Sequence, residues 1–100
     1  MQTNLSFESN KFKRAIMTRH AQKRSAQRGF TRASVELIRT FGERSHDGQG
    51  GIRCLMTRAA VERLGSVLGR SQQLEALAGA YVVLSADDDA VVITASHRYQ

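Results

Sequence analysis

One histidine and two arginines are spaced so that a helix would carry them on one face. His20, Arg24 and Arg28 follow one another at intervals of four residues, a spacing that drifts by only about 40° per step around an α-helix. A neutral imidazole can accept a proton near neutral pH, and a guanidinium can stabilise the extra charge on a phosphate under attack. RNA cleavage without a metal needs a base for the 2′-hydroxyl, a cation for the phosphorane and an acid for the leaving oxygen. The spacing therefore predicts a phosphate-directed catalytic site, with His20 as the base and Arg24 as its cation.

Further candidates for this site lie near the same segment, on a middle strand and at the end of the chain. His97 follows the last apolar run and is the candidate for the remaining catalytic role. Phosphate or RNA contacts are expected from Arg19, Lys23, Arg28, Arg53, Arg98 and Tyr99. Arginines on such a helix also form structural ion pairs, here with acids such as Glu36 or Glu43, and the sequence leaves that alternative open.

The charge of the chain favours a polyanionic partner. Its 100 residues include 15 Lys and Arg against 9 Asp and Glu, for a formal net charge of +6. Arginine, whose rigid fork suits phosphate, supplies most of the cations. No acid occurs between Glu8 and Glu36, although eight cations lie between Lys11 and Arg32. We expect RNA or another nucleic acid, or an acidic protein, to meet this segment.

Local signals predict two helices that would position the histidine and arginines. Thr18 is a good N-cap for a helix that runs to Arg28. Gly29 is the usual residue for the left-handed position that ends a helix. Thr31 is a second N-cap, and the apolar spacing after it predicts a helix over 33–41.

The rest of the chain alternates between hairpins and helical segments. Residues 43–56 indicate a glycine-rich hairpin, and 72–78 a short helical piece. Two β-branched runs at 80–85 and 90–95 flank three aspartates, which predicts a second hairpin. A further helix is expected over 58–68, its buried side formed by Val61, Leu64, Val67 and Leu68.

These elements predict an α+β fold. Its N-terminal helices would pack on one face of a small antiparallel sheet, in the order α-α-β-β-α-β-β. Residues 1–10 are expected to be a polar lead-in, and residues 11–100 a single domain.

The first predicted helix also carries a family motif. Its residues His20-Ala-Gln-Lys-Arg24-Ser-Ala-Gln-Arg28-Gly29-Phe30 read H-x3-R-x3-R-G before an apolar residue. This resembles the opening of a bacterial family of small domains of unknown function, whose members commonly read H-A-x-x-R-M-x-x-R-G-I and end in a V-V-T hairpin, here Val91 to Thr94. Ser25 stands where the family has an apolar residue.

That family has been grouped with the RelE- and barnase-like ribonuclease toxins. The resemblance implies a RelE-like outline, and a toxin-type, metal-independent endoribonuclease or RNA-binding protein. It also implies a toxin–antitoxin context, in which the partner is a small acidic antitoxin-like protein.

Two non-catalytic hypotheses compete with this one. Residues 18–41 could form a helix-turn-helix, with Arg32, Glu36 and Arg39 facing a DNA groove. Alternatively, the basic face could bind an acidic protein without any catalysis.

Several classes of protein are excluded or disfavoured. The single Cys54 cannot form an internal disulfide, and with three histidines it offers too few ligands for a structural zinc site, so we expect neither a metal nor a cofactor. No apolar run approaches the length of a membrane span, and the first residues lack the apolar core of a secretory signal. The sequence thus predicts a cytoplasmic protein without a membrane partner.

Overall fold

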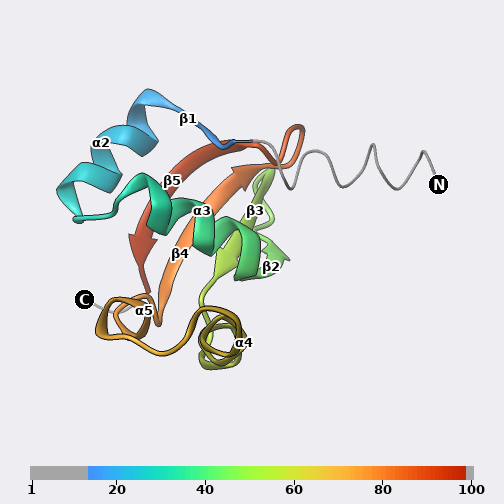
Figure 1. The fold of residues 1–100 in the computed structure, drawn as a ribbon. Coiled ribbons are helices and arrows are strands. Elements are labelled where there is room, and N and C mark those ends of the chain that lie inside the picture. Colours follow the sequence, from blue (N-terminus) through green and yellow to red (C-terminus); the bar gives the residue numbers. More distant parts are fainter. Residues whose placement is uncertain (1–13, 99–100) are drawn as a thin grey trace.

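Two layers organise the computed structural model, which describes residues 14–98 (Figure 1). Along these residues the elements are β1 (Ile16–Met17), α2 (Arg19–Gln27), α3 (Arg32–Phe41), β2 (Glu43–His46), β3 (Gly51–Leu55), α4 (Arg58–Leu68), α5 (Gln72–Glu75), β4 (Ala80–Ser85) and β5 (Val91–His97). The α+β class expected from the sequence is confirmed. The expected lead-in over 1–10 and the candidate Tyr99 lie outside the described residues.

Threonine side chains begin the three longer helices. The hydroxyls of Thr18, Thr31 and Thr57 each accept a hydrogen bond from the backbone N–H three residues on, which satisfies an amide that has no partner within the helix. Gly29 ends α2 with a φ of 76°, a left-handed conformation that costs a glycine little. The predicted starts and stops of these helices are therefore confirmed.

The strands form one mixed sheet in the order β1-β5-β4-β3-β2. The four longer strands are antiparallel neighbours, but β1 runs parallel to β5. Backbone bonds hold β1 at this edge, from Ile16 N–H to Ala90 O (2.7 Å) and from Thr18 N–H to Val92 O (3.1 Å). The expectation of a purely antiparallel sheet was wrong because a strand of two residues has no alternating pattern to reveal it.

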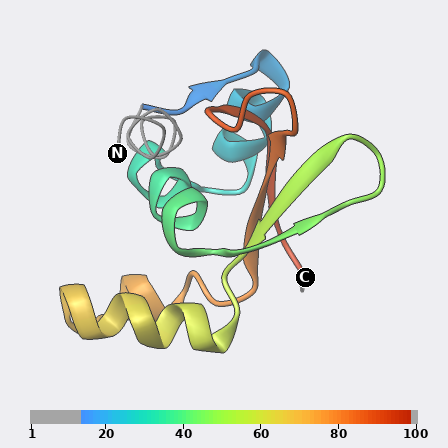
Figure 2. The same cartoon turned by 90° about the vertical axis from the view of Figure 1, so that its right-hand side faces the viewer.

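Both N-terminal helices cover the same face of the sheet (Figure 2). Helix α2 packs on β5, and α3 packs on β3 and β4. The core between the layers includes Val35 and Ile38 from α3, and Val82, Leu84 and Val92 from the sheet. Helices α4 and α5 lie at one end of the sheet, and no helix in residues 14–98 covers its other face (Figure 2).

Helix α4 is only partly buried. Val61 and Leu64 are in the core, as predicted, but Val67 and Leu68 are 66% and 62% exposed. The prediction that these last two are buried was wrong, since the final turn of α4 extends past the core that the first two turns contact.

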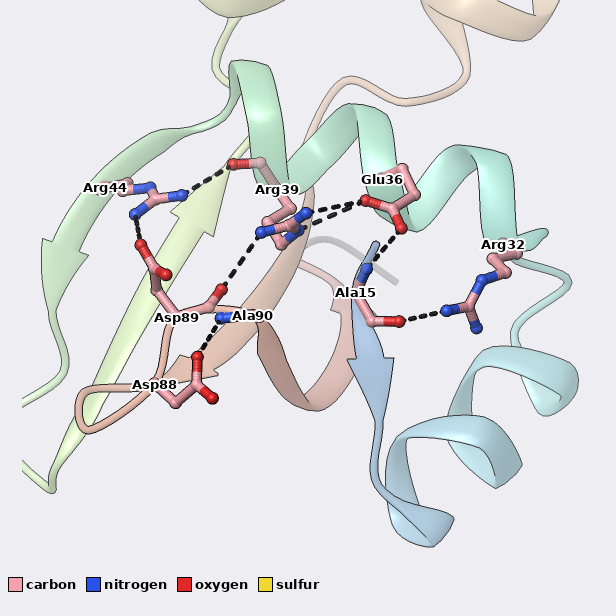
Figure 3. A network of polar contacts seen from close by, with 8 residues as sticks. All are labelled: Ala15, Arg32, Glu36, Arg39, Arg44, Asp88, Asp89 and Ala90. Carbon is pink, nitrogen blue, oxygen red and sulfur yellow. Dashed lines mark hydrogen bonds and ion pairs between the residues drawn. The ribbon is translucent and has the colours of Figure 1, made fainter. Parts of the chain in front are cut away.

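A buried arginine joins α3 to the β4–β5 loop, and its carboxylate partner joins α3 to the residue before β1 (Figure 3). Arg39, only 1% exposed, donates to Glu36 Oε1 (3.2 Å) and to the carbonyl of Asp89 (3.4 Å) in the β4–β5 loop. The other oxygen of Glu36 accepts from the backbone N–H of Ala15 (2.7 Å). Arg44 bonds to the Asp89 carboxylate (3.0 Å) and to the Arg39 carbonyl (3.3 Å). This network fixes β1, and therefore the start of α2, against the rest of the fold.

Candidate nucleic-acid interface

Helix α2 turns a basic face to solvent. It buries Ala21 and Ser25 against the sheet, so the residues on the far side of the helix point outward. Arg19, His20 and Lys23 are exposed and Arg24 is half-buried. At roughly 100° per residue these four side chains form one continuous arc. We call them the α2 basic surface.

Five carboxylates of the described residues pair with arginines that lie outside α2. Within residues 14–98, none of Arg19, Lys23 and Arg24 forms an ion pair with a carboxylate. The ion pairs between described residues join Arg39, Arg44, Arg58, Arg63 and Arg70 to Glu36, Glu43, Glu62, Glu75 and Asp89. The two acids that the sequence offered to Arg24 are thus bound by other arginines, Glu36 by Arg39 and Glu43 by Arg63.

One of these pairings also shifts protonation equilibria on α4 and α5. Arg58 donates to Glu75 at 2.8 Å, and this bond lowers the pKa of the Glu75 carboxyl and raises the pKa of the Arg58 guanidinium. Both side chains are therefore held in their charged forms at neutral pH, and their charges offset each other. The α2 basic surface has no such compensation from the described carboxylates.

A groove of about 350 Å³ lies at the C-terminal end of α2. Its lining includes Arg28, Phe30, Ser34, Gln73, Leu77 and His97. The rings of Phe30 and His97 are stacked, with centroids 4.8 Å apart and planes inclined by 22°. The left-handed Gly29 turns the chain so that Phe30 meets the end of β5. We call this hollow the terminal groove.

The structure brings together some of the site residues predicted from sequence and separates others. Arg28 and His97 both line the terminal groove. His20 does not, because it lies in the first turn of α2, about 12 Å from Arg28 along the axis, the rise of eight helical residues. The stripe from His20 through Arg24 to Arg28 therefore spans the helix without converging on His97.

Arg53 and Arg98 lie away from the α2 basic surface. Arg53 is exposed and pairs across strands with Val83, whose neighbours Val82 and Leu84 face the core. It therefore projects from the sheet face opposite α2. Arg98 lines a separate hollow together with Thr57 and Gly79, and its N–H donates to the Gly79 carbonyl.

Sequence reasoning missed two residues of the terminal groove as candidate binding residues. In the sequence, Phe30 was only the apolar residue that follows the H-x3-R-x3-R-G motif, and Gln73 on α5 belonged to no motif. The position of Phe30 directly after Gly29 was the one available clue, since a residue that follows a helix end commonly packs back onto the structure.

The geometry of α3 does not favour the helix-turn-helix hypothesis. A recognition helix must project into a DNA groove, but α3 lies on the sheet and buries Val35, Ile38 and Arg39. Glu36 is bound to Arg39, and Arg32 donates to the carbonyl of Ala15 (Figure 3). The expectation that Arg39 faces a groove was wrong, because this guanidinium is buried in the protein.

Cys54 and Asp47 have shifted pKa values that follow from their roles in the fold. Burial raises the pKa of the Cys54 thiol, which makes it a poor nucleophile at neutral pH. Two backbone N–H groups, of Gln49 and Gly51, donate to the Asp47 carboxylate and lower its pKa.

Over residues 14–98 no three His, Cys, Asp or Glu side chains gather as a metal site. Nor does any helix in that range have the length and apolarity needed to cross a bilayer.

Comparison of the chain with protein-family models, with curated proteins and with solved structures yields no match. The residues and their geometry therefore carry the functional argument.

Proposed function

We propose that this protein binds RNA through the α2 basic surface. The observation that carries the proposal is the segregation of charge: within residues 14–98, Arg19, Lys23 and Arg24 form no ion pair with a carboxylate, while the arginines of the ion pairs in this range lie outside α2. Like charges on one short helix repel one another in the free protein, and a phosphate backbone relieves that repulsion while releasing counterions.

The nature of the nucleic acid follows from two further points. The H-x3-R-x3-R-G segment resembles a family grouped with ribonuclease toxins, which directs the proposal to RNA. The helix that would read duplex DNA, α3, is packed on the sheet and has its central charges bound inside the protein. A basic surface without a projecting recognition helix suits contacts to a phosphate backbone, which carry affinity rather than sequence specificity.

Cleavage of the bound RNA is a second candidate, favoured by the lining of the terminal groove. His97 and Arg28 line the same cavity, so an imidazole and a guanidinium border the space that one phosphate would occupy. His97 would take the proton of the 2′-hydroxyl, and the 2′ oxygen would bond to phosphorus while the bond to the 5′ oxygen breaks. The leaving oxygen would take its proton from water. His20, which lies outside this groove, would contribute to binding only.

The binding proposal is tested by two variants of equal charge change. The first replaces Arg19, Lys23 and Arg24 with glutamine. The control replaces the ion-paired Arg58, Arg63 and Arg70 with glutamine, so that each variant lowers the net charge of +6 by three. Affinity for a fluorescent single-stranded RNA is measured against salt concentration, with thermal melting to verify the fold.

We expect the α2 variant to bind more weakly and to lose about 2 from the slope of log affinity against log salt, since each phosphate contact to a single strand contributes roughly 0.7. The control variant should retain most of the affinity for RNA and most of the salt dependence. Equal weakening in the two variants would mean that only net charge matters, and it would refute the α2 basic surface as the binding site.

Cleavage is tested with His97→Ala and His20→Ala in the presence of a chelator, with products separated on a gel. We expect His97→Ala to bind RNA without cutting it, and His20→Ala to cut. If the parent binds RNA but leaves it intact, the protein is a binding module and the second candidate is wrong.

A further inference from the structure

The terminal groove combines an aromatic stack with an apolar wall. Phe30, at the corner between α2 and α3, stacks on His97 at the end of β5. The groove is also lined by Ala76 and Leu77, which follow α5. A flat, apolar ligand can therefore contact aromatic rings and aliphatic carbon within one cavity, which is the surrounding that a nucleobase takes outside a helix.

The same groove offers hydrogen-bonding groups of both kinds. Gln73 supplies an amide, which has two donor hydrogens and an acceptor oxygen. Ser34 supplies a hydroxyl, which is held by a 2.9 Å bond to the Thr31 hydroxyl. A nucleobase presents donors and acceptors along its edge, so this lining suits a base better than it suits a lipid or another purely apolar group.

The groove also adjoins the α2 basic surface. Arg28, at the end of α2, lines it, and Arg24 lies one helical turn before Arg28, about 6 Å along the axis. A nucleic-acid strand whose phosphates follow α2 would therefore reach the groove with its next nucleotide.

We infer that the terminal groove binds one unpaired nucleobase, so that the ligand class is single-stranded RNA. This inference rests on the proposed function, because the base arrives on a strand held by the α2 basic surface. A base in a duplex is stacked on both faces and paired along its edge, and it cannot enter a groove of this kind unless it leaves the helix.

Two substitutions test the groove without touching the α2 basic surface. Phe30→Leu removes the stacking ring but keeps an apolar side chain against the core. Ala76→Leu adds bulk at an exposed position of right-handed helical backbone, and so narrows the groove without a change in charge. Each variant is titrated with a single-stranded RNA and with a fully paired RNA duplex, beside the parent and the glutamine variant of α2.

We expect Phe30→Leu to weaken single-strand binding at least about fivefold, the low end of the loss when a base loses its aromatic partner. Ala76→Leu should act in the same direction, and neither should change duplex binding. The glutamine variant of α2 should bind both the single strand and the duplex more weakly than the parent does.

The possible failures are distinguishable. If both groove variants bind the single strand as the parent does, the groove inference is overturned while the proposed function stands. If the α2 variant binds as the parent does, or the parent binds no RNA, then the proposed function fails and the inference falls with it.

Discussion

The buried pair of Arg39 and Glu36 should be strongly coupled in its effect on stability. The Arg39 side chain is 2% exposed and that of Glu36 is 29% exposed, so the two charges are desolvated to different extents. Glu36→Gln leaves the charge of a fully buried guanidinium without its carboxylate at 3.2 Å. Arg39→Met leaves a carboxylate that still reaches water and still accepts the N–H of Ala15.

The magnitudes follow from this asymmetry. Removing one partner of a fully buried pair costs about 3–5 kcal/mol, and we expect Glu36→Gln to fall at the lower end because Arg39 keeps its bond to the Asp89 carbonyl. Arg39→Met should cost about 2 kcal/mol, since the stranded carboxylate remains partly solvated. For a domain of 100 residues, each kcal/mol lowers the melting temperature by roughly 4–8 °C.

The double variant Glu36→Gln with Arg39→Met isolates the interaction energy between the two side chains from their contacts with the rest of the protein. No charge is left to be buried, so its loss of stability should be smaller than the sum of the two single losses by about 1–3 kcal/mol. Urea unfolding of the four proteins measures the cycle, provided that the slope with urea stays constant. Additive losses, or a larger loss for Arg39→Met than for Glu36→Gln, would refute the reasoning.

Three further variants probe the stability of the fold. Gly42→Ala should destabilise by more than about 1 kcal/mol, because the new methyl carbon would lie 2.6 Å from the backbone carbonyl oxygen of Ile38; urea unfolding measures the loss, and a neutral effect would contradict the packing at this corner. Val67→Gln and Leu68→Gln together should change the free energy of unfolding by less than about 0.5 kcal/mol per site, since both side chains are exposed. The pKa of Asp47 is lowered in the folded state. The carboxylate therefore stabilises the fold at pH values above its pKa in the unfolded chain, and this stabilisation is lost as the pH falls through about 4 and below. Asp47→Asn should remove that part of the acid sensitivity, as measured by urea midpoints across this range.

Much of the fold could be predicted because its signals are local. A threonine before a helix-forming segment can cap that helix through its own hydroxyl, as Thr18, Thr31 and Thr57 do. The valine-rich runs around the three aspartates likewise specify their own hairpin. These features need only neighbouring residues, so sequence alone carries them.

The parts that could not be predicted depend on residues far apart in the chain. Strand β1 has two residues, and it is held by pairing with β5 and by the bond from Glu36 to the N–H of Ala15, the residue before it. Arg39 lies one helical turn after the buried Val35, but a charged side chain is expected in solvent, and its burial depends on the carbonyl of the distant Asp89 loop.

One part of the candidate site could likewise be predicted from the sequence, and the other part could not. The basic stripe of α2 could be predicted from helical spacing, because all its members belong to one helix. The terminal groove could not, since Phe30 and His97 meet only when the α2–α3 corner packs on the end of β5. For the same reason, the sequence predicted one site for His20 and His97, although His20 lies in the first turn of α2 and His97 lies on β5, in the groove beyond the other end of α2.

The most direct test of the central claim is the salt dependence of RNA binding by the parent protein. In this account Arg19, Lys23 and Arg24 of the α2 basic surface contact the phosphates of a single strand, and Arg28 adds a fourth contact. We expect log affinity to fall with log salt at a slope of about −2 to −3. Binding that is unchanged by salt, or no binding at low salt, would contradict the account.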